Sequence, residues 1–224
     1  LARALAGKRL APDVAKIGVR AVKAAAARDA GSLEAALTKA GNLAAARRPP
    51  TPEEVKTLTT EVLKLGDPVR GEAVFRRKEL QCLACHGVGG AGGQVGPDLT
   101  SIGASAPPDY LVESLLLPNK AVKEGYHAIR IVTVQDKVYL GRAVREGNGQ
   151  LVRLTPDDKQ IVIPTADIAE RGQTKSLMPE SLTDPLTKQE FADLARFLSE
   201  LGKLGPYAPS KSRVVRRWQL IEGA

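Results

Sequence analysis

The sequence is poor in the residue types that usually staple a fold or anchor a large core. Its 224 residues include two cysteines, two histidines, one methionine and one tryptophan, and aromatic residues make up only 4%. Two cysteines cannot build a disulfide scaffold, and their separation by two residues indicates local chemistry instead. No apolar run approaches the roughly 20 residues of a membrane span, so we expect no transmembrane segment. Since the chain begins at Leu1, we interpret it as a piece of a longer protein without its targeting segment.

The apolar and charged residues that are present indicate a folded protein of one or two compact units. Hydrophobic residues make up 43%, and the net charge is +8. Residues 1–65 carry 12 basic and 6 acidic side chains and residues 202–224 carry 5 and 1, whereas residues 66–120 with 172–201 carry 8 and 11. The positive charge therefore lies at the two ends of the chain, with no recognisable nucleic-acid-binding module, so we expect no nucleic-acid partner.

Residues 1–120 have mainly helical patterns. Residues 1–48 are rich in alanine and predict two short packed helices, such as those at the end of an α-solenoid. Capping boxes at Thr51–Glu54 and Thr187–Glu190 mark the starts of two further helices. The first predicted helix begins after Pro12. The others run from Ser32 to Gly41, from Thr51 to about Leu65, from Asp67 through Phe75, from Pro107 to Pro118, and from Thr187 through Leu198.

Between Tyr126 and Ala169 the pattern changes to short β-branched runs separated by turn residues. The runs cover residues 129–134, 138–140 and 161–163, and the sequence Glu-Gly-Asn-Gly at 146–149 is typical of a turn. These residues predict a small antiparallel sheet or barrel of four or five strands.

The motif Cys82-Leu83-Ala84-Cys85-His86 carries the clearest chemistry. It is the signature of c-type haem attachment, in which two thiols add across the two haem vinyl groups and the next residue offers an imidazole to the iron. A redox dithiol lacks the βα context here, and a zinc site lacks a second pair of ligands. The string Gly87–Gly92 matches a dinucleotide-binding fingerprint, but it lacks the strand before it and the helix after it that such a site requires.

Met178 is the candidate for the sixth iron ligand. It is the single methionine and lies in Ser-Leu-Met-Pro, a predicted loop before the last helix. A methionine in a core commonly fills a gap, but His/Met is also a common axial pair in cytochromes. His127, at the start of a predicted strand, is the rival ligand.

These motifs resemble a class I cytochrome c. The matching strings are Gly71-x-x-x-Phe75, Cys82-x-x-Cys85-His86, Gly96-Pro97-Asp98-Leu99, Met178-Pro179, and a last helix with Leu194 and Phe197. The resemblance implies that the first and last helices cross with small and aromatic residues in contact, Gly71 and Phe75 on the first helix and Leu194 and Phe197 on the last. It also implies that Pro97 orients the proximal histidine through its carbonyl and that Leu99 packs on the haem.

Residues 67–201 contain the strings Cys-Leu-Ala-Cys-His, Gly-Pro-Asp-Leu-Thr-Ser-Ile-Gly, Tyr-Leu-Val-Glu-Ser-Leu-Leu-Leu-Pro-Asn, Glu-Gly-Tyr and Ser-Leu-Met-Pro. With these strings the segment is also similar to the haem-binding domain of large planctomycete and verrucomicrobial proteins, where such a domain commonly follows HEAT-like repeats. The resemblance implies a mainly α fold. Its parts are a helical lead (1–65), a cytochrome c core (66–120 and 172–201), an inserted antiparallel β-domain (121–171) and a tail (202–224). The insertion accounts for an unusually long separation between His86 and Met178. The tail holds Trp218, to which the sequence assigns no role.

The expected function is electron transfer by one covalent haem c with His86 and Met178 as axial ligands. Its partner would be a redox protein or a dehydrogenase domain of the same parent chain, in the periplasm or elsewhere outside the cytoplasm. Two alternatives stay open. One is a haem-based ligand sensor or peroxidase-like enzyme with a labile sixth ligand, and the other is a docking module in which the haem mainly staples a small domain.

Overall fold

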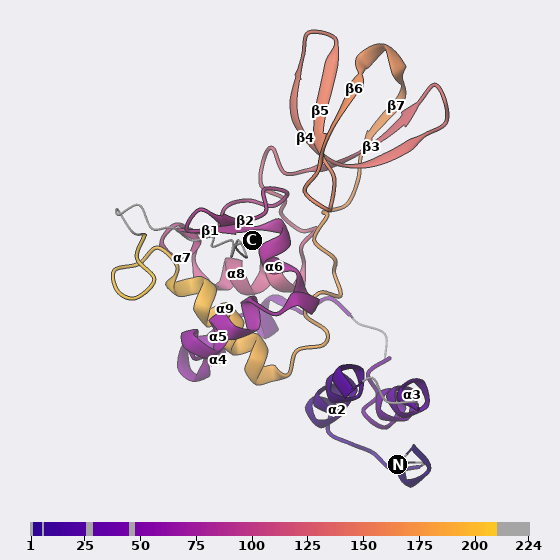
Figure 1. The fold of residues 1–224 in the computed structure, drawn as a ribbon. Helices are drawn as coiled ribbons and strands as arrows, with labels where there is room; N and C mark the ends of the chain where they lie inside the picture. Colours follow the sequence, from indigo (N-terminus) through magenta and orange to yellow (C-terminus); the bar gives the residue numbers. More distant parts are fainter. Residues whose placement is uncertain (1, 6, 26–28, 45–47, 210–224) are drawn as a thin grey trace, which may run out of the picture.

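The computed structural model describes residues 2–5, 7–25, 29–44 and 48–209, which form nine α-helices and seven strands (Figure 1). The helices are α1 (Ala2–Leu5), α2 (Pro12–Ala25), α3 (Ala30–Ala40), α4 (Pro52–Leu65), α5 (Pro68–Phe75), α6 (Cys82–Cys85), α7 (Ile102–Ser105), α8 (Pro108–Leu116) and α9 (Lys188–Glu200). The strands are β1 (Gly87–Val88), β2 (Ala91–Gly92), β3 (Ala128–Thr133), β4 (Val138–Gly147), β5 (Gln150–Leu154), β6 (Gln160–Pro164) and β7 (Ile168–Gln173). Trp218 lies outside the described residues.

Both predicted capping boxes are formed. The Thr51 side chain accepts a hydrogen bond from Glu54 N at the start of α4, and the Thr187 side chain accepts one from Glu190 N at the start of α9. In each case the glutamate side chain reaches back to the backbone of the threonine. The prediction for α3 differs from the structure, because this helix starts at Ala30 rather than at Ser32. The Ser32 hydroxyl donates to Asp29 O within the first turn instead of capping the helix.

Helix α9 lies at the centre of the helical core and packs against α4, α5, α7 and α8. The crossing with α5 is close at Gly71, where a Cβ would lie 1.9 Å from Asp193 O, so only glycine permits this approach. One turn further along α5, the Phe75 ring packs at a tilt against Phe197 of α9, with ring centroids 5.4 Å apart. The crossing of first and last helices that the class I resemblance implied is therefore present.

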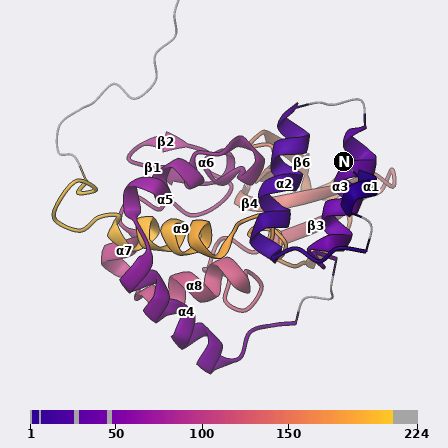
Figure 2. The same cartoon turned by 90° about the horizontal axis from the view of Figure 1, so that it is seen from below.

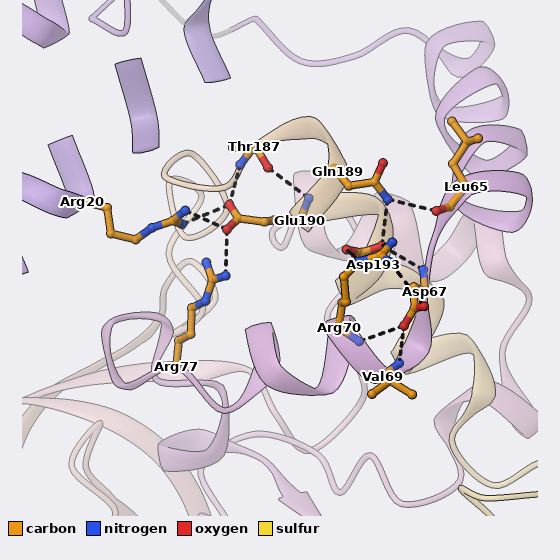
Figure 3. A network of polar contacts seen from close by, with 10 residues as sticks. All are labelled: Arg20, Leu65, Asp67, Val69, Arg70, Arg77, Thr187, Gln189, Glu190 and Asp193. Atoms are coloured by element: carbon orange, nitrogen blue, oxygen red, sulfur yellow. Dashed lines mark hydrogen bonds and ion pairs between the residues drawn. The ribbon is translucent and has the colours of Figure 1, made fainter. Parts of the chain in front are cut away.

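A buried carboxylate, Asp193, fastens this crossing from within the core (Figure 3). It is 2% exposed and accepts hydrogen bonds from Arg70 Nε at 2.8 Å, from Asp67 N at 2.8 Å and from Gln189 Nε2 at 2.9 Å. The Gln189 amide also donates to Leu65 O. Burial acts to raise the pKa of Asp193, but these hydrogen bonds outweigh it and the pKa is lowered. The ends of α4 and α5 are thus tied to α9.

The five remaining long strands form one antiparallel sheet in the order β6-β5-β4-β3-β7. Asn148 and Gly149, both with positive φ, make the tight turn between β4 and β5. The buried residues of the sheet form their own apolar cluster of Ile129, Ile131, Leu151 and Ile163. The predicted small antiparallel sheet is confirmed, and its last strand continues to Gln173. Because this sheet accompanies the helices, the expected class "mainly α" describes the helical regions but not residues 128–173.

The N-terminal helices α2 and α3 pack against each other at the lower end of the view in Figure 1, while the sheet stands at the upper end. Seen from below, α2 lies beside the end of α9 at which that helix begins (Figure 2). Within the described ranges, no helix is both long and apolar enough to cross a membrane.

Candidate haem-binding site

The Cys-x-x-Cys-His motif folds as one helical turn, α6, followed by an extended residue. Gln81 adopts the left-handed conformation (φ 53°) and turns the chain from the 3-10 helix at Lys78–Leu80 into α6. Cys82 and Cys85 are three residues apart in this turn, so their side chains leave from the same side. His86 is extended, with φ −114°, and its amide donates to Cys82 O at 2.8 Å. The local backbone therefore presents two thiols and an imidazole in one short segment.

The His86 ring is oriented by a backbone carbonyl. Its Nδ1 lies 2.8 Å from Pro97 O. Because a carbonyl only accepts hydrogen bonds, Nδ1 carries the proton and Nε2 keeps its lone pair. Burial lowers the pKa of His86, although the bond to Pro97 acts in the opposite direction. The neutral tautomer that results is the form of histidine that ligates a metal.

The loop after the motif closes tightly on the same ring. A Cβ on Gly96 would lie 2.5 Å from His86 Cε1 and 2.7 Å from its Nδ1, so the imidazole lies against a backbone with no side chain at this point. Gly96 N donates to Cys85 O and Leu99 N donates to Gly87 O, both at 2.7 Å. The ring is therefore held by its hydrogen bond and by close backbone contact together.

The two thiols do not have the character of a reactive dithiol. Burial raises the pKa of Cys82 to about 11, and it also raises the pKa of Cys85, with a further contribution from the Asp158 carboxylate. A catalytic redox pair usually has one thiol with a lowered pKa. Among the described residues there is also no group of three or more Cys, His, Asp or Glu side chains placed to hold a metal ion, as a structural zinc site requires.

Met178 and Leu99 pack against the same helical core as Cys82. Met178 is half-buried, and its amide donates to the Ser176 hydroxyl at 3.1 Å. Ser176 N in turn donates to Asn119 Oδ1 at 2.7 Å, which ties the Met178 loop to the end of α8. The structure thus brings all three residues to one apolar cluster. His127 directly precedes β3 and is half-buried.

The glycine string 87–92 forms the two-stranded hairpin β1–β2. Gly89 and Gly90 both have positive φ and make the turn between its strands. A dinucleotide site needs a helix directly after the glycines. Here the chain instead turns back as the antiparallel strand β2, so the segment is not a dinucleotide site.

The five-stranded sheet reaches the loop beside the motif, and the sequence analysis did not predict this contact. Asp158 Oδ1 accepts from Gln94 N at 3.1 Å, and Arg142 Nη2 donates to Gln94 O at 2.8 Å. Arg142 also lies over the Tyr126 ring, 4.5 Å from its centroid. A pocket of about 720 Å³ lies between residues 76–84 and the turn at Pro156 and Asp157. Neither Cys82, Cys85 nor His86 lines it. Such contacts join residues far apart in sequence, and no local pattern marks them.

Residues 66–129 match the family model described as cytochrome c oxidase, cbb3-type, subunit III. The match covers less than half of the chain and no curated protein matches it. The matched segment contains Cys82, Cys85, His86, Pro97 and Leu99 but ends before Met178. The chain therefore contains a cytochrome c-like domain, and such a domain implies haem binding and haem-based electron transfer.

The residues around the motif fit a haem on their own geometry. The Gly96 backbone leaves room for the His86 ring only because a Cβ is absent, and the Pro97 carbonyl favours the tautomer whose lone pair is on Nε2. Apolar Leu99 and Met178 lie on the adjoining core. A thioether, an imidazole and two thiols are the protein groups that a c-type haem uses.

Proposed function

We propose that this chain carries one haem c, bound covalently through Cys82 and Cys85, and that it transfers single electrons. The observation that carries the proposal is the hydrogen bond between His86 of the Cys-x-x-Cys-His motif and Pro97 O. When bound, the haem supplies a reversible one-electron couple at its iron. The thiols attach it by adding across the vinyl groups: each sulfur forms a bond to one vinyl carbon and the thiol hydrogen passes to the other. This addition needs no oxidant.

In this proposal His86 Nε2 is the proximal ligand and the Met178 thioether is the distal one. The Pro97 carbonyl keeps Nδ1–H bonded, which holds the ring in place and makes Nε2 a better donor. A neutral thioether favours the reduced iron, so Met178 would raise the reduction potential. Because His86 and Met178 would both hold the iron, no position on it would be open to a substrate and the chemistry supplied would be electron transfer. We therefore assign no catalytic residue.

The setting of the domain follows from the resemblance described above. We infer that residues 66–120 and 172–201 form the haem core and that residues 121–171 are an insertion in it. We also infer that residues 1–65 continue a HEAT-like helical region of a larger planctomycete-type protein outside the cytoplasm. The core carries 8 basic and 11 acidic side chains, which would steer it towards a positively charged redox partner or dehydrogenase domain.

Haem extraction, the reduction potential and ligand binding test this function. Acid–acetone extraction should leave the haem on the protein, and Cys82→Ala with Cys85→Ala should release it. Met178→Ala should lower the reduction potential and open the iron to carbon monoxide. If the wild-type protein already binds carbon monoxide rapidly and turns over peroxide, and Met178→Ala changes neither spectrum nor potential, the sensor or peroxidase alternative replaces electron transfer.

A further inference from the structure

One face of α2 contacts the segment through which the chain enters α9. Asp13, Lys16 and Arg20 are spaced three and four residues apart, so they share a helix face. Asp13 Oδ2 accepts from Lys188 N at 3.1 Å, and Lys16 Nζ donates to Leu186 O at 2.6 Å. All three contacts therefore fall on the five residues from Leu186 to Glu190, since Arg20 reaches the last of them.

Glu190 is the point at which three parts of the chain meet (Figure 3). Arg20 approaches it with Nη1 at 3.0 Å and Nη2 at 2.8 Å, and Arg77 Nη2 donates to the same carboxylate at 2.7 Å. Thr187 N completes the set at 2.9 Å. The Glu190 side chain is only 15% exposed. The Glu190 carboxylate therefore accepts four contacts in a largely buried position. It differs from exposed surface ion pairs, which contribute little to the free energy of unfolding.

The two segments that flank this junction are those that carry the proposed iron ligands. Residues 174–187, all of them described, contain neither helix nor strand, and Met178 lies within them. Their far end is held by Leu186, which is 2% exposed in the helical core. On the other side, Arg77 directly precedes the 3-10 helix that leads into Cys82.

We propose that the Asp13–Lys16–Arg20 face of α2 positions the Met178 segment, acting through Glu190, and so sets how firmly Met178 is held at the iron. The proposal rests on Met178 ligation as proposed above. A loop without regular structure has few fixed points, so removal of one of them increases its motion. The chain between Met178 and α9 is restrained by its own turns and by the burial of Leu186. The contacts from α2 are a further restraint on it.

The physical consequence is that a region outside the haem core influences an axial ligand. Arg20 and Arg77 both donate to Glu190 Oε1, so loss of Arg20 leaves Arg77 with the carboxylate but frees α2 from it. Arg77 Nη1 is buried and has no hydrogen-bond partner among the described residues. Arg77 therefore cannot replace the contact of Arg20 with a second hydrogen bond to Glu190 unless its side chain moves. We therefore assign Arg20 and Glu190 as positioning residues.

The test compares Arg20→Ala with Lys23→Ala in the full haem-loaded chain. Lys23 lies on the same helix and pairs with Glu34 of α3 at 3.0 Å, so its loss removes the same charge from α2 without reaching α9. The readouts are amide hydrogen exchange of residues 176–187, the near-infrared thioether–iron band, and the rate of carbon monoxide binding to the reduced protein. For Arg20→Ala we expect about tenfold faster exchange and ligand entry, the effect of losing the charge-assisted contact between Arg20 and Glu190.

Rescue by a conservative variant separates positioning from folding. Arg20→Lys keeps a donor towards Glu190 and should recover most of the thioether band, whereas Lys23→Ala should match the wild type throughout. If Arg20→Ala behaves as Lys23→Ala does while Met178→Ala abolishes the band, this inference is overturned and the proposed function stands. If the wild type has no thioether band at all, Met178 ligation fails, and unchanged exchange in Arg20→Ala would overturn the positioning role separately.

Discussion

The two sides of the candidate site are held in different ways. On the His86 side, the ring is fixed by Pro97 and Gly96, residues that follow it within the same loop. On the Met178 side, the fixed points come from elsewhere in the chain: Asn119 after α8 and, at the loop's far end, the face of α2. One proposed ligand, His86, is thus positioned by local backbone geometry, and the other, Met178, by long-range polar contacts.

This difference predicts different sensitivities. Local backbone packing has little room to relax, so a small steric change on the His86 side should have a large effect. The Met178 side relies on several hydrogen bonds, each of which contributes modestly and can be lost singly. A single substitution should therefore disrupt the whole His86 side, whereas each substitution on the Met178 side should weaken that side only in part.

The largest effect should follow from Gly96→Ala. The added Cβ would lie 2.5 Å from His86 Cε1, and the ring cannot move away without breaking its bond to Pro97. We expect a loss of about 3 kcal/mol in the free energy of unfolding, together with a sharp fall in the yield of haem-loaded protein. Gly172→Ala is the control, because a Cβ there would meet nothing within 4 Å. Equal haem yield from the two variants would contradict the tight packing inferred for His86.

A smaller effect should follow from Asn119→Ala, on the Met178 side. This variant removes the acceptor for Ser176 N and the side-chain donor to Glu180, for a loss of about 1.5 kcal/mol. We expect weaker thioether–iron absorption with haem attachment unchanged. Asp109→Ala, near the other end of α8, removes only an acceptor for the adjacent Tyr110 amide and should leave the band intact. Loss of haem attachment in Asn119→Ala would mean that the two sides are not independent.

The same asymmetry explains what the sequence could predict. The Cys-x-x-Cys-His motif and the Gly-Pro-Asp-Leu string lie within one short stretch, and the family match covers this stretch. Capping boxes at Thr51 and Thr187, and the β-branched runs, likewise act over a few residues, and each marked its element. Local structure of this kind depends on neighbours in sequence, which a pattern can register.

Long-range contacts leave no such pattern. Arg20 and Glu190 are 170 positions apart, and nothing near either residue in the sequence indicates the other. Arg142 and Asp158 appear in the sequence as ordinary charges of an exposed sheet, yet they meet Gln94 beside the motif. The partner of a charged residue can be identified only when the fold brings the two together. For this reason the junction at Glu190 could be found only in three dimensions.

The pH dependence of stability should sharpen the comparison on the Met178 side. Burial acts to raise the pKa of Glu190, but hydrogen bonds from Arg20, Arg77 and Thr187 N outweigh it and lower the pKa from 4.5 to about 2. Because the folded-state value is depressed, the stabilisation is complete above pH 4.5 and is lost as the pH falls towards about 2. After allowance for solvent screening, it amounts to about 1 kcal/mol.

Glu190→Gln isolates this contribution from those of the other carboxylates. Glutamine also suits the third position of a capping box, so α9 should keep its start. Unfolding by denaturant should show the variant less stable than the wild type near neutral pH, with the two curves converging as the pH is lowered through this range. A constant difference at every pH would show that the carboxylate charge is not what stabilises the junction.

The smallest effect should come from the contact between the five-stranded sheet and the His86 side. Asp158 has a positive φ of 60°, so glycine and asparagine both suit its backbone and differ only in whether they offer an acceptor to Gln94 N. Asp158→Gly should cost about 0.5 kcal/mol locally and raise the amide exchange rate of Gln94 about two- to threefold. Asp158→Asn should stay near the wild type. Both should keep the haem spectrum, since Gly96 and Pro97 hold His86 without help from the sheet. A spectral change in Asp158→Gly as large as that in Asn119→Ala would instead make the five-stranded sheet part of the site, and the His86 side would then depend on distant residues as the Met178 side does.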